Sequence, residues 1–173
     1  MVLLAESIKL TLFPAIMAFA ALSDLFTMSI ANRVSIILVA GFGLLAALTQ
    51  MGASDLLSHV GAAAAVLAAV FVFFAFGWIG GGDAKLAAAT ALWFGFAHLL
   101  DYLLYASLFG GALTFAIIYY RGMPLPPVFG GLAWAERLHR SDAGVPYGIA
   151  LAAGALVVYP HTEWMAAIGR QSG

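Results

Sequence analysis

The sequence predicts an all-α polytopic membrane protein, a bundle of six transmembrane helices with the N- and C-termini outside. Of the 173 residues, 64% are hydrophobic and 9% are charged, whereas a soluble domain carries about 25% charged residues. A membrane span takes about 20 apolar residues, so this length holds six spans with short connections. The composition excludes soluble, disordered and nucleic-acid-binding proteins, and we expect residues 1–173 to form one integral membrane domain.

Six apolar runs mark the predicted spans in chain order. They cover residues 8–25, 34–49, 56–79, 84–97, 99–120 and 146–164. Each run is long enough for a tilted or slightly short transmembrane helix, and the fourth is the shortest. The first run also has features of a cleaved signal sequence, with a lysine near its start and Ala18-Phe19-Ala20 inside it. The five spans that follow favour a first span that is kept.

Basic residues orient the bundle, because cytoplasmic loops accumulate Lys and Arg. The connections after the first, third and fifth spans hold Arg33, Lys85, Arg121, Arg137 and Arg140. The opposite side receives Lys9 and Arg170. This distribution predicts that those connections face the cytoplasm and that both chain ends lie outside.

The one long connection, residues 121–145, begins with Met123-Pro124-Leu125-Pro126-Pro127, which cannot continue a helix. In residues 132–140, which follow, helical spacing places three apolar side chains on one face and the arginines towards another. We therefore expect a short interfacial helix on the cytoplasmic surface. A solvated connector fits the same residues equally well.

Two of the eight acidic residues differ from the others in position. Asp24 lies in the last turn of the first span, and Asp83 follows three glycines at the start of the fourth. The topology places both on the cytoplasmic side at similar depth. Ionisable residues at membrane depth are costly and usually functional. The remaining acids, which fall in loops or near the chain ends, are Glu6, Asp55, Asp101, Glu136, Asp142 and Glu163.

Two neighbouring carboxylates in a poorly screened site can share one proton. Such a pair can activate water as a general base while protonating a carbonyl oxygen or a leaving amine, which is peptide hydrolysis. Gly80 and Gly82 would release the backbone from helical angles, so that an extended peptide could lie beside Asp83. Asp83 is expected at a helix N-terminus and Asp24 near a C-terminus, so helix polarity predicts that Asp24 more often holds the shared proton.

Three segments resemble the type IV prepilin peptidases. Residues 23–33 resemble the first catalytic segment, in which an aspartate precedes an Asn-Arg pair that opens the second span. Residues 80–86 resemble the Gly-x-Gly-Asp motif followed by a lysine, and residues 145–150 resemble the Pro-Phe/Tyr-Gly stretch that opens the last span. The segments come in the family order and span nearly the whole chain.

The resemblance implies a multi-pass aspartyl endopeptidase of the bacterial inner membrane with Asp24 and Asp83 as the catalytic pair. It implies that the enzyme cuts a short basic leader from a prepilin on the cytoplasmic side, after a glycine. The cysteine-bearing methylation region of longer family members is missing, which implies the short form of Flp, or tight-adherence, pili without methyltransferase activity. The implied partners are the prepilin, the lipid bilayer and the pilus assembly machinery, with no nucleic acid and no cofactor.

Further residues are candidates for substrate binding or support: Gly80, Gly82, Lys85, Asn32, Arg33, Pro146, Tyr147 and Gly148. Lys85 fits an electrostatic contact to substrate or lipid phosphate, or a snorkelling anchor. The Asn-Arg pair fits a cap on the second span facing headgroups better than a substrate contact. The Pro-Tyr-Gly stretch fits a helix start with an interfacial tyrosine, to which the resemblance adds a role in shaping the cleft by packing.

Two other classes of function fit the composition. A small proton-coupled transporter could relay protons through the same two acids, and a structural subunit of an envelope assembly could be equally hydrophobic. The four histidines have no metal-ligand spacing, so no metal site is expected. Cleavage of a prepilin that depends on both aspartates would favour the peptidase.

Overall fold

The computed structural model describes residues 2–169, and these residues form helices and no strand. The α-helices are α1 (Val2–Thr27), α2 (Asn32–Leu48), α3 (Ala53–Ala75), α4 (Gly81–Arg121), α5 (Ala133–His139), α6 (Tyr147–Val158) and α7 (Glu163–Gly169). Two 3-10 helices are η1 (Pro127–Phe129) and η2 (Tyr159–His161). The all-α prediction is confirmed. Arg170, which contributed to the predicted orientation, lies outside the described residues.

Three of the described helices are long and apolar enough to cross a membrane. They are α1 from Ala5 onwards, α3 and α4, and α2 is a shorter apolar helix. Within α3 only Ala62 and Val66 are buried, and most other side chains of this helix are exposed. Because these exposed side chains are apolar, α3 presents a surface suited to lipid rather than to water.

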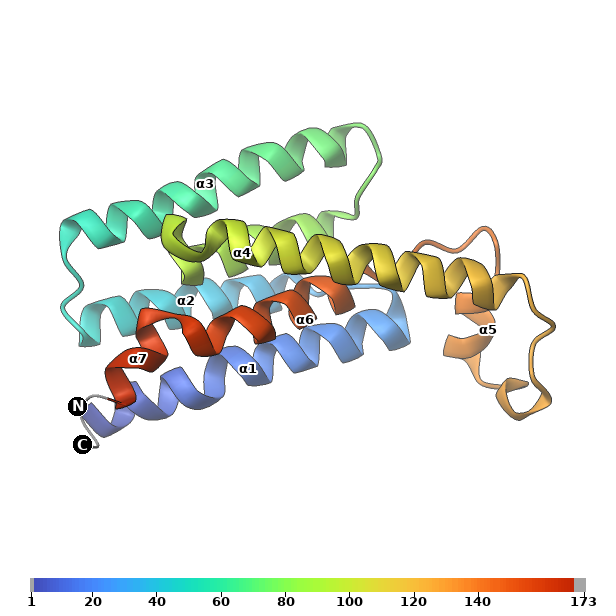
Figure 1. Ribbon diagram of the computed structural model, residues 1–173, viewed down its shortest axis with the longest axis horizontal. Helices are drawn as coiled ribbons and strands as arrows, with labels where there is room; N and C mark the ends of the chain where they lie inside the picture. The colour runs from blue at the N-terminus through green and yellow to red at the C-terminus, as the bar shows by residue number, and fades with distance from the viewer. Residues whose placement is uncertain (1, 170–173) are drawn as a thin grey trace.

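The predicted fourth and fifth spans form the two arms of α4. The backbone of Gly95 has φ 59° and ψ −173°, which is not helical. Figure 1 shows that the N-terminal arm (residues 81–94, green) and the C-terminal arm (residues 96–121, yellow) run in opposite directions. We had expected the break at His98. It falls at Gly95 instead because only glycine adopts this backbone conformation without strain.

Side chains from other helices satisfy carbonyl groups that the reversal frees. Nδ1 of His59, on α3, donates to the carbonyl oxygen of Leu92 at 2.7 Å. Nε1 of Trp164, on α7, donates to the carbonyl oxygen of Trp93 at 2.8 Å. Since an unpaired buried carbonyl is costly, these two bonds fix the turn between the arms against its neighbours.

The predicted last span is interrupted. The helix α6 ends at Val158, the chain passes through η2, and α7 begins at Glu163. Pro160 lies within η2, and a proline lacks the N–H that an α-helix requires. The prediction of one helical run over residues 146–164 was therefore wrong.

An aromatic cluster packs the centre of the bundle. The ring of Phe13, on α1, stacks on Tyr159 with centroids 4.3 Å apart and lies 5.0 Å from the ring of Trp93. The indole N–H of Trp93 donates to the carbonyl oxygen of Leu38, on α2, at 3.0 Å. The N-terminal arm of α4 thus lies in the core, where its residues 86–95 are all buried.

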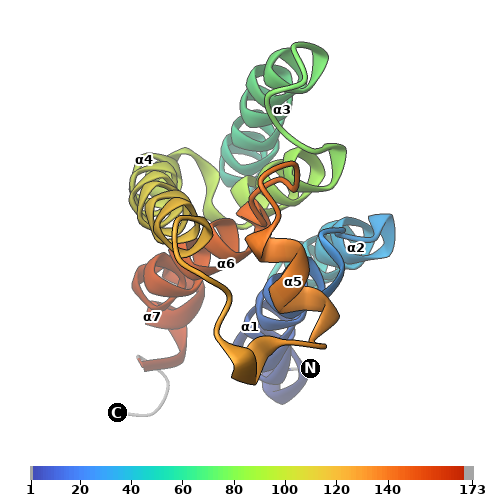
Figure 2. The same ribbon diagram turned by 90° about the vertical axis from the view of Figure 1, so that its right-hand side faces the viewer.

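The two ends of the bundle differ. The start of α1 and helix α7 lie at one end (Figure 1), which we call the terminal end, and the connection of residues 122–146 lies at the other, the loop end. Figure 2 shows α5 lying across the loop end, in front of α1 and α6. Trp134 packs edge-on against Phe26 with ring centroids 6.0 Å apart, and Arg137 donates to the carbonyl oxygen of Phe26 at 2.8 Å. Residues 133–139 are helical, as predicted, and cover the C-terminal end of α1.

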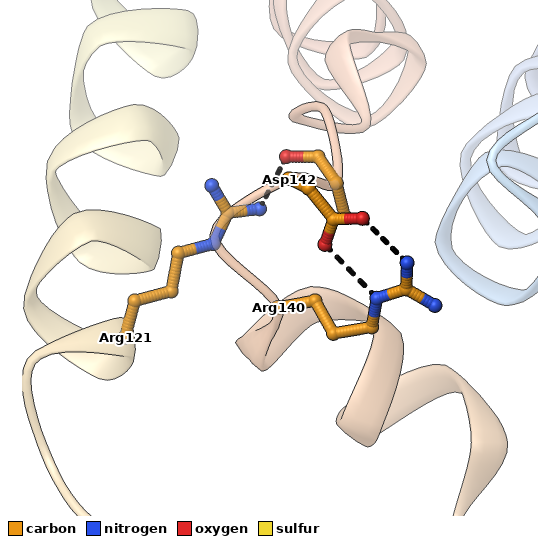
Figure 3. A network of polar contacts seen from close by, with 4 residues as sticks. Arg121, Arg140 and Asp142 are labelled. Carbon is orange, nitrogen blue, oxygen red and sulfur yellow. Dashed lines mark hydrogen bonds and ion pairs between the residues drawn. The ribbon is translucent and has the colours of Figure 1, made fainter.

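Arg121 holds this loop against the end of α4. Its guanidinium donates to the carbonyl oxygens of Leu138, Ala143 and Gly144, each at 2.8 Å. Figure 3 shows it beside the ion pair of Arg140 and Asp142, whose hydrogen bonds hold the pKa of the Asp142 carboxyl below its usual range. Both partners of that pair are exposed, so it contributes little to stability.

Candidate active site

Asp24 is a buried acid at the loop end. It lies in the last turn of α1, and only 4% of the residue is exposed. The backbone N–H of Gly148 donates to its Oδ2 at 2.7 Å. A buried carboxylate requires such a partner, and a bond to a charged acceptor is stronger than a neutral one.

Asp83 lies in the first turn of α4 and is partly buried. Gly80 is the N-cap, with extended backbone angles of φ −73° and ψ 147°, so Asp83 is the third helical residue. A side chain at this position folds back towards the N-cap N–H, as in a capping box, and the Asp83 carboxyl does interact with the backbone of Gly80. A Cβ at position 80 would lie 3.0 Å from Oδ2 of Asp83, so glycine leaves room for this conformation.

The N-terminus of α6 brings the two acids together. The backbone of Gly148 interacts with the carboxyl groups of both Asp24 and Asp83, and the two carboxyl groups lie within electrostatic range of each other. Helix α6 packs against both α1 and α4, which explains how residues distant in sequence meet at one place. A water molecule beside this pair would have one carboxylate to accept its proton and a second carboxyl to donate one.

The same arrangement changes the expected division of labour between the acids. Gly148 is the second residue of α6, so Asp24 lies at the positive end of α6 as well as at the negative end of α1. The prediction that Asp24 more often holds the shared proton considered α1 alone. Its physical basis is weaker here, because each acid has a helix N-terminus beside it, and the assignment of the proton to Asp24 stays a prediction.

Two glycines allow close packing around Ile30, in the connection between α1 and α2. A Cβ at Gly148 would lie 2.6 Å from Cδ1 of Ile30 and 2.8 Å from Oδ2 of Asp24, and one at Gly82 would lie 3.1 Å from the carbonyl oxygen of Ile30. We had expected Gly82 to leave helical angles and open the backbone to substrate. It is helical and packs against Ile30 instead. Sequence reasoning overlooked Ile30, since an isoleucine in a short connection carries no chemical signal.

The lysine and the Asn-Arg pair lie at the surface of the loop end. Nζ of Lys85 donates to Oδ1 of Asn32 at 2.9 Å, which links the starts of α4 and α2. The N-cap of α2 is Ala31, and no side chain caps the helix, so the capping role expected of the Asn-Arg pair was wrong. Arg33 is exposed in the first turn of α2. These residues lie near the acids in sequence, and among the described residues no hydrogen bond or ion pair joins them to either carboxyl group.

The Pro-Tyr-Gly stretch starts α6, as predicted. Pro146 is the buried N-cap, and Tyr147 is the first helical residue. The hydroxyl groups of Tyr147 and Thr114 lie 3.2 Å apart, which fastens the start of α6 to the C-terminal arm of α4. The stretch therefore positions the N–H of Gly148 at Asp24.

A model of the type IV leader peptidase family matches residues 11–115, which is more than half of the chain and includes both acids. The chain belongs to the type IV leader peptidase family. Membership in this leader peptidase family, together with the three apolar helices, makes the chain a membrane protein with a leader-peptidase-like function. No curated protein and no solved structure matches the chain. Gly148 lies beyond the matched leader peptidase segment, so its link to the acids comes from the geometry.

Proposed function

We propose that this protein is a membrane-embedded aspartyl endopeptidase that removes the leader peptide from a prepilin of the Flp, or tight-adherence, type. The observation on which the proposal rests is that Asp83 lies within electrostatic range of Asp24, whose Oδ2 accepts the hydrogen bond of the Gly148 N–H at the start of α6. The family match supports leader cleavage as the reaction, because both acids lie inside the matched segment.

The chemistry needs only the two carboxyl groups and a water molecule. One carboxylate takes a proton from water as the water oxygen attacks the scissile carbonyl carbon, and the other carboxyl group protonates the carbonyl oxygen. Collapse of the resulting diol breaks the C–N bond while a proton passes to the leaving amine. In this scheme the N–H of Gly148 orients Asp24, and Gly80 leaves Asp83 free to fold back on its own helix end.

The proposed topology has six spans in one integral membrane domain of the bacterial inner membrane. The spans are α1, α2, α3, the two arms of α4, and α6 with α7. Two observations support this arrangement. The start of α1 and helix α7 lie at the same end of the bundle (Figure 1), as an even number of crossings requires. Most of the basic residues lie near the loop end, close to the starts of α2 and α4, at the end of α4 and in and directly after α5, so we assign this end to the cytoplasm.

The proposed substrate follows from the family resemblance. It is a prepilin with a short basic leader that ends in glycine, followed by the apolar pilin helix, and pilus assembly machinery is a possible further partner. We propose no methyltransferase activity. The apolar surroundings of Asp24 suit a scissile bond next to an apolar helix.

A cleavage assay tests the proposal. The purified protein in detergent is mixed with a synthetic peptide that has a basic leader ending in glycine before an apolar helix, and products are identified by mass. Asp24→Asn and Asp83→Asn should each lower the rate by about 10²–10⁴-fold, the contribution of a positioned acid or base. Asp101→Asn, which changes an exposed acid on the C-terminal arm of α4, should cut at the parent rate. Folded variants of both site acids that still cut at the parent rate would overturn the proposal.

A further inference from the structure

A second polar site lies at the terminal end, away from the two aspartates. It is a cavity of about 280 Å³ between α1, the start of α3, the reversal in α4 and the start of α7. Its ionisable and aromatic lining includes Lys9, Asp55, His59, His98, Glu163 and Trp164. None of the residues proposed for peptide cleavage lines this cavity.

Lys9 is the deepest charged group of the cavity. Only 8% of this residue is exposed, and its Nζ lies 6.0 Å from the ring centroid of Trp164. Within residues 2–169, no carboxylate forms an ion pair with this ammonium group. A buried ammonium without a directly paired anion is costly, so this position favours a ligand that supplies the anion. Sequence reasoning had used Lys9 as a marker of the outer side and as the lysine of a signal-like first run.

The acids of the cavity lie at its rim. Asp55 is in the first turn of α3 and Glu163 is the first residue of α7, and both are exposed. His59 and His98 are half-buried, and both acids lie within electrostatic range of His59. The exposure of these groups therefore increases from the buried cation, through the two half-buried imidazoles, to the exposed carboxylates. This order matches a ligand that inserts an anionic group first and leaves a cationic group at the mouth.

We propose that this cavity binds a phosphate group joined by a short linker to a primary ammonium group, as in the headgroup of phosphatidylethanolamine. Lys9 would donate to the phosphate, and Asp55 and Glu163 would accept from the ammonium, all as charge-assisted hydrogen bonds. The lipid source rests on the transmembrane arrangement proposed above, which puts the terminal end at the outer membrane surface. In a phospholipid the phosphate lies nearer the hydrocarbon than the ammonium, in the same order as the cavity's partners.

Tryptophan fluorescence can report occupancy, because Trp93 and Trp164 both line the cavity. The purified protein is titrated with dihexanoyl phosphatidylethanolamine, and separately with the phosphatidylglycerol and phosphatidylcholine of the same chain length, each below its micelle concentration. We expect the ethanolamine lipid to bind saturably. The other two lipids lack a primary ammonium, so their affinity should be lower by roughly tenfold or more. Glycerophosphoethanolamine, which has no acyl chains, distinguishes a lipid ligand from a soluble one. If it binds equally well, the same site takes a soluble phosphoamine.

Variants test each half of the site. We expect two variants to bind the ethanolamine lipid roughly tenfold or more weakly than the parent: the single variant Lys9→Met, and the double variant Asp55→Asn with Glu163→Gln. Lys9→Arg, which keeps the positive charge, should retain binding. Asp101→Asn, an exposed acid of the C-terminal arm of α4 outside the cavity lining, should bind like the parent. Equal binding of all three lipids by the parent protein would overturn the proposal even if a variant failed to fold. The readout does not involve peptide cleavage, so it is independent of the proposed peptidase activity.

Discussion

Replacing Gly148 by alanine should damage cleavage far more than folding. The new methyl group would lie 2.6 Å from Cδ1 of Ile30, 2.8 Å from Oδ2 of Asp24 and 3.1 Å from Cβ of Asp24. The terminal methyl of Ile30 can rotate away. The Asp24 carboxyl must also move, and it then loses the 2.7 Å hydrogen bond from the Gly148 N–H.

The size of the effect follows from that bond. A hydrogen bond to a charged group is worth about 1.5–3 kcal/mol, and each 1.36 kcal/mol corresponds to about tenfold in rate. We therefore expect kcat/KM of Gly148→Ala to fall roughly 10- to 100-fold. The overpacking itself should cost about 1–3 kcal/mol of unfolding free energy.

Two other glycines separate activity from stability. In Gly154→Ala, also on α6, the methyl would lie 2.7 Å from the backbone nitrogen of Ala106. This variant should unfold more easily, but its folded fraction should keep the parent kcat/KM. In Gly43→Ala nothing lies within 4 Å of the methyl, so neither quantity should fall. The assay is peptide cleavage per folded molecule, with thermal unfolding in detergent measured in parallel.

One result would refute the reasoning. If folded Gly148→Ala keeps the parent kcat/KM within roughly twofold while Asp24→Asn is inactive, then Asp24 works without the N–H of Gly148. The N-terminus of α6 would then serve packing alone.

Three further substitutions test other parts of the structure. Gly95→Ala should lower the unfolding free energy by about 1–3 kcal/mol, because the backbone angles at this position are open only to glycine. Gly77 has φ +73° and open space around it, so Gly77→Ala should lower the unfolding free energy by less in the same thermal measurement. Asn32→Ala removes an exposed hydrogen bond, so it should lower the unfolding free energy by at most about 1 kcal/mol and leave kcat/KM nearly unchanged. A large loss of cleavage would instead assign Asn32 to substrate binding. Arg121→Met frees three loop carbonyls and should speed tryptic cleavage within residues 122–146. Asp142→Asn breaks only an exposed ion pair and should leave the rate of tryptic cleavage unchanged. If Arg121→Met were cleaved no faster than the parent protein, Arg121 would not hold the loop.

The local positions of the two acids could be predicted from the sequence. An apolar run that ends in Ser23-Asp24 places Asp24 in a last helical turn, and three glycines before Asp83 place it in a first one. Both statements depend on neighbouring residues only. The short helix within residues 132–140 was predictable for the same reason, since helical spacing is a local property.

The contacts that join the acids could not be predicted in this way. Gly148 meets Asp24 only because α6 packs against both α1 and α4, and no spacing within one segment encodes that packing. Lys9 served to mark the outer side of the bundle, and nothing in its own segment predicted that its neighbours in space bury it. The reversal at Gly95 was misplaced because the local pattern offers several glycine and polar positions, and only the partners on α3 and α7 select among them.

The unequal arms of α4 would set the depth of the proposed reaction in the membrane. At 1.5 Å per residue, residues 81–94 rise about 20 Å from the turn at Gly95, whereas residues 96–121 rise nearly 40 Å. The hydrocarbon layer of a bilayer is about 30 Å thick. In the proposed topology, Asp83, near the tip of the shorter arm, would therefore sit below the water boundary that the longer arm passes, and a pilin helix could stay inserted in the lipid while its leader is cut. Hydrolysis at that level would draw its water through the protein or through a locally thinned leaflet.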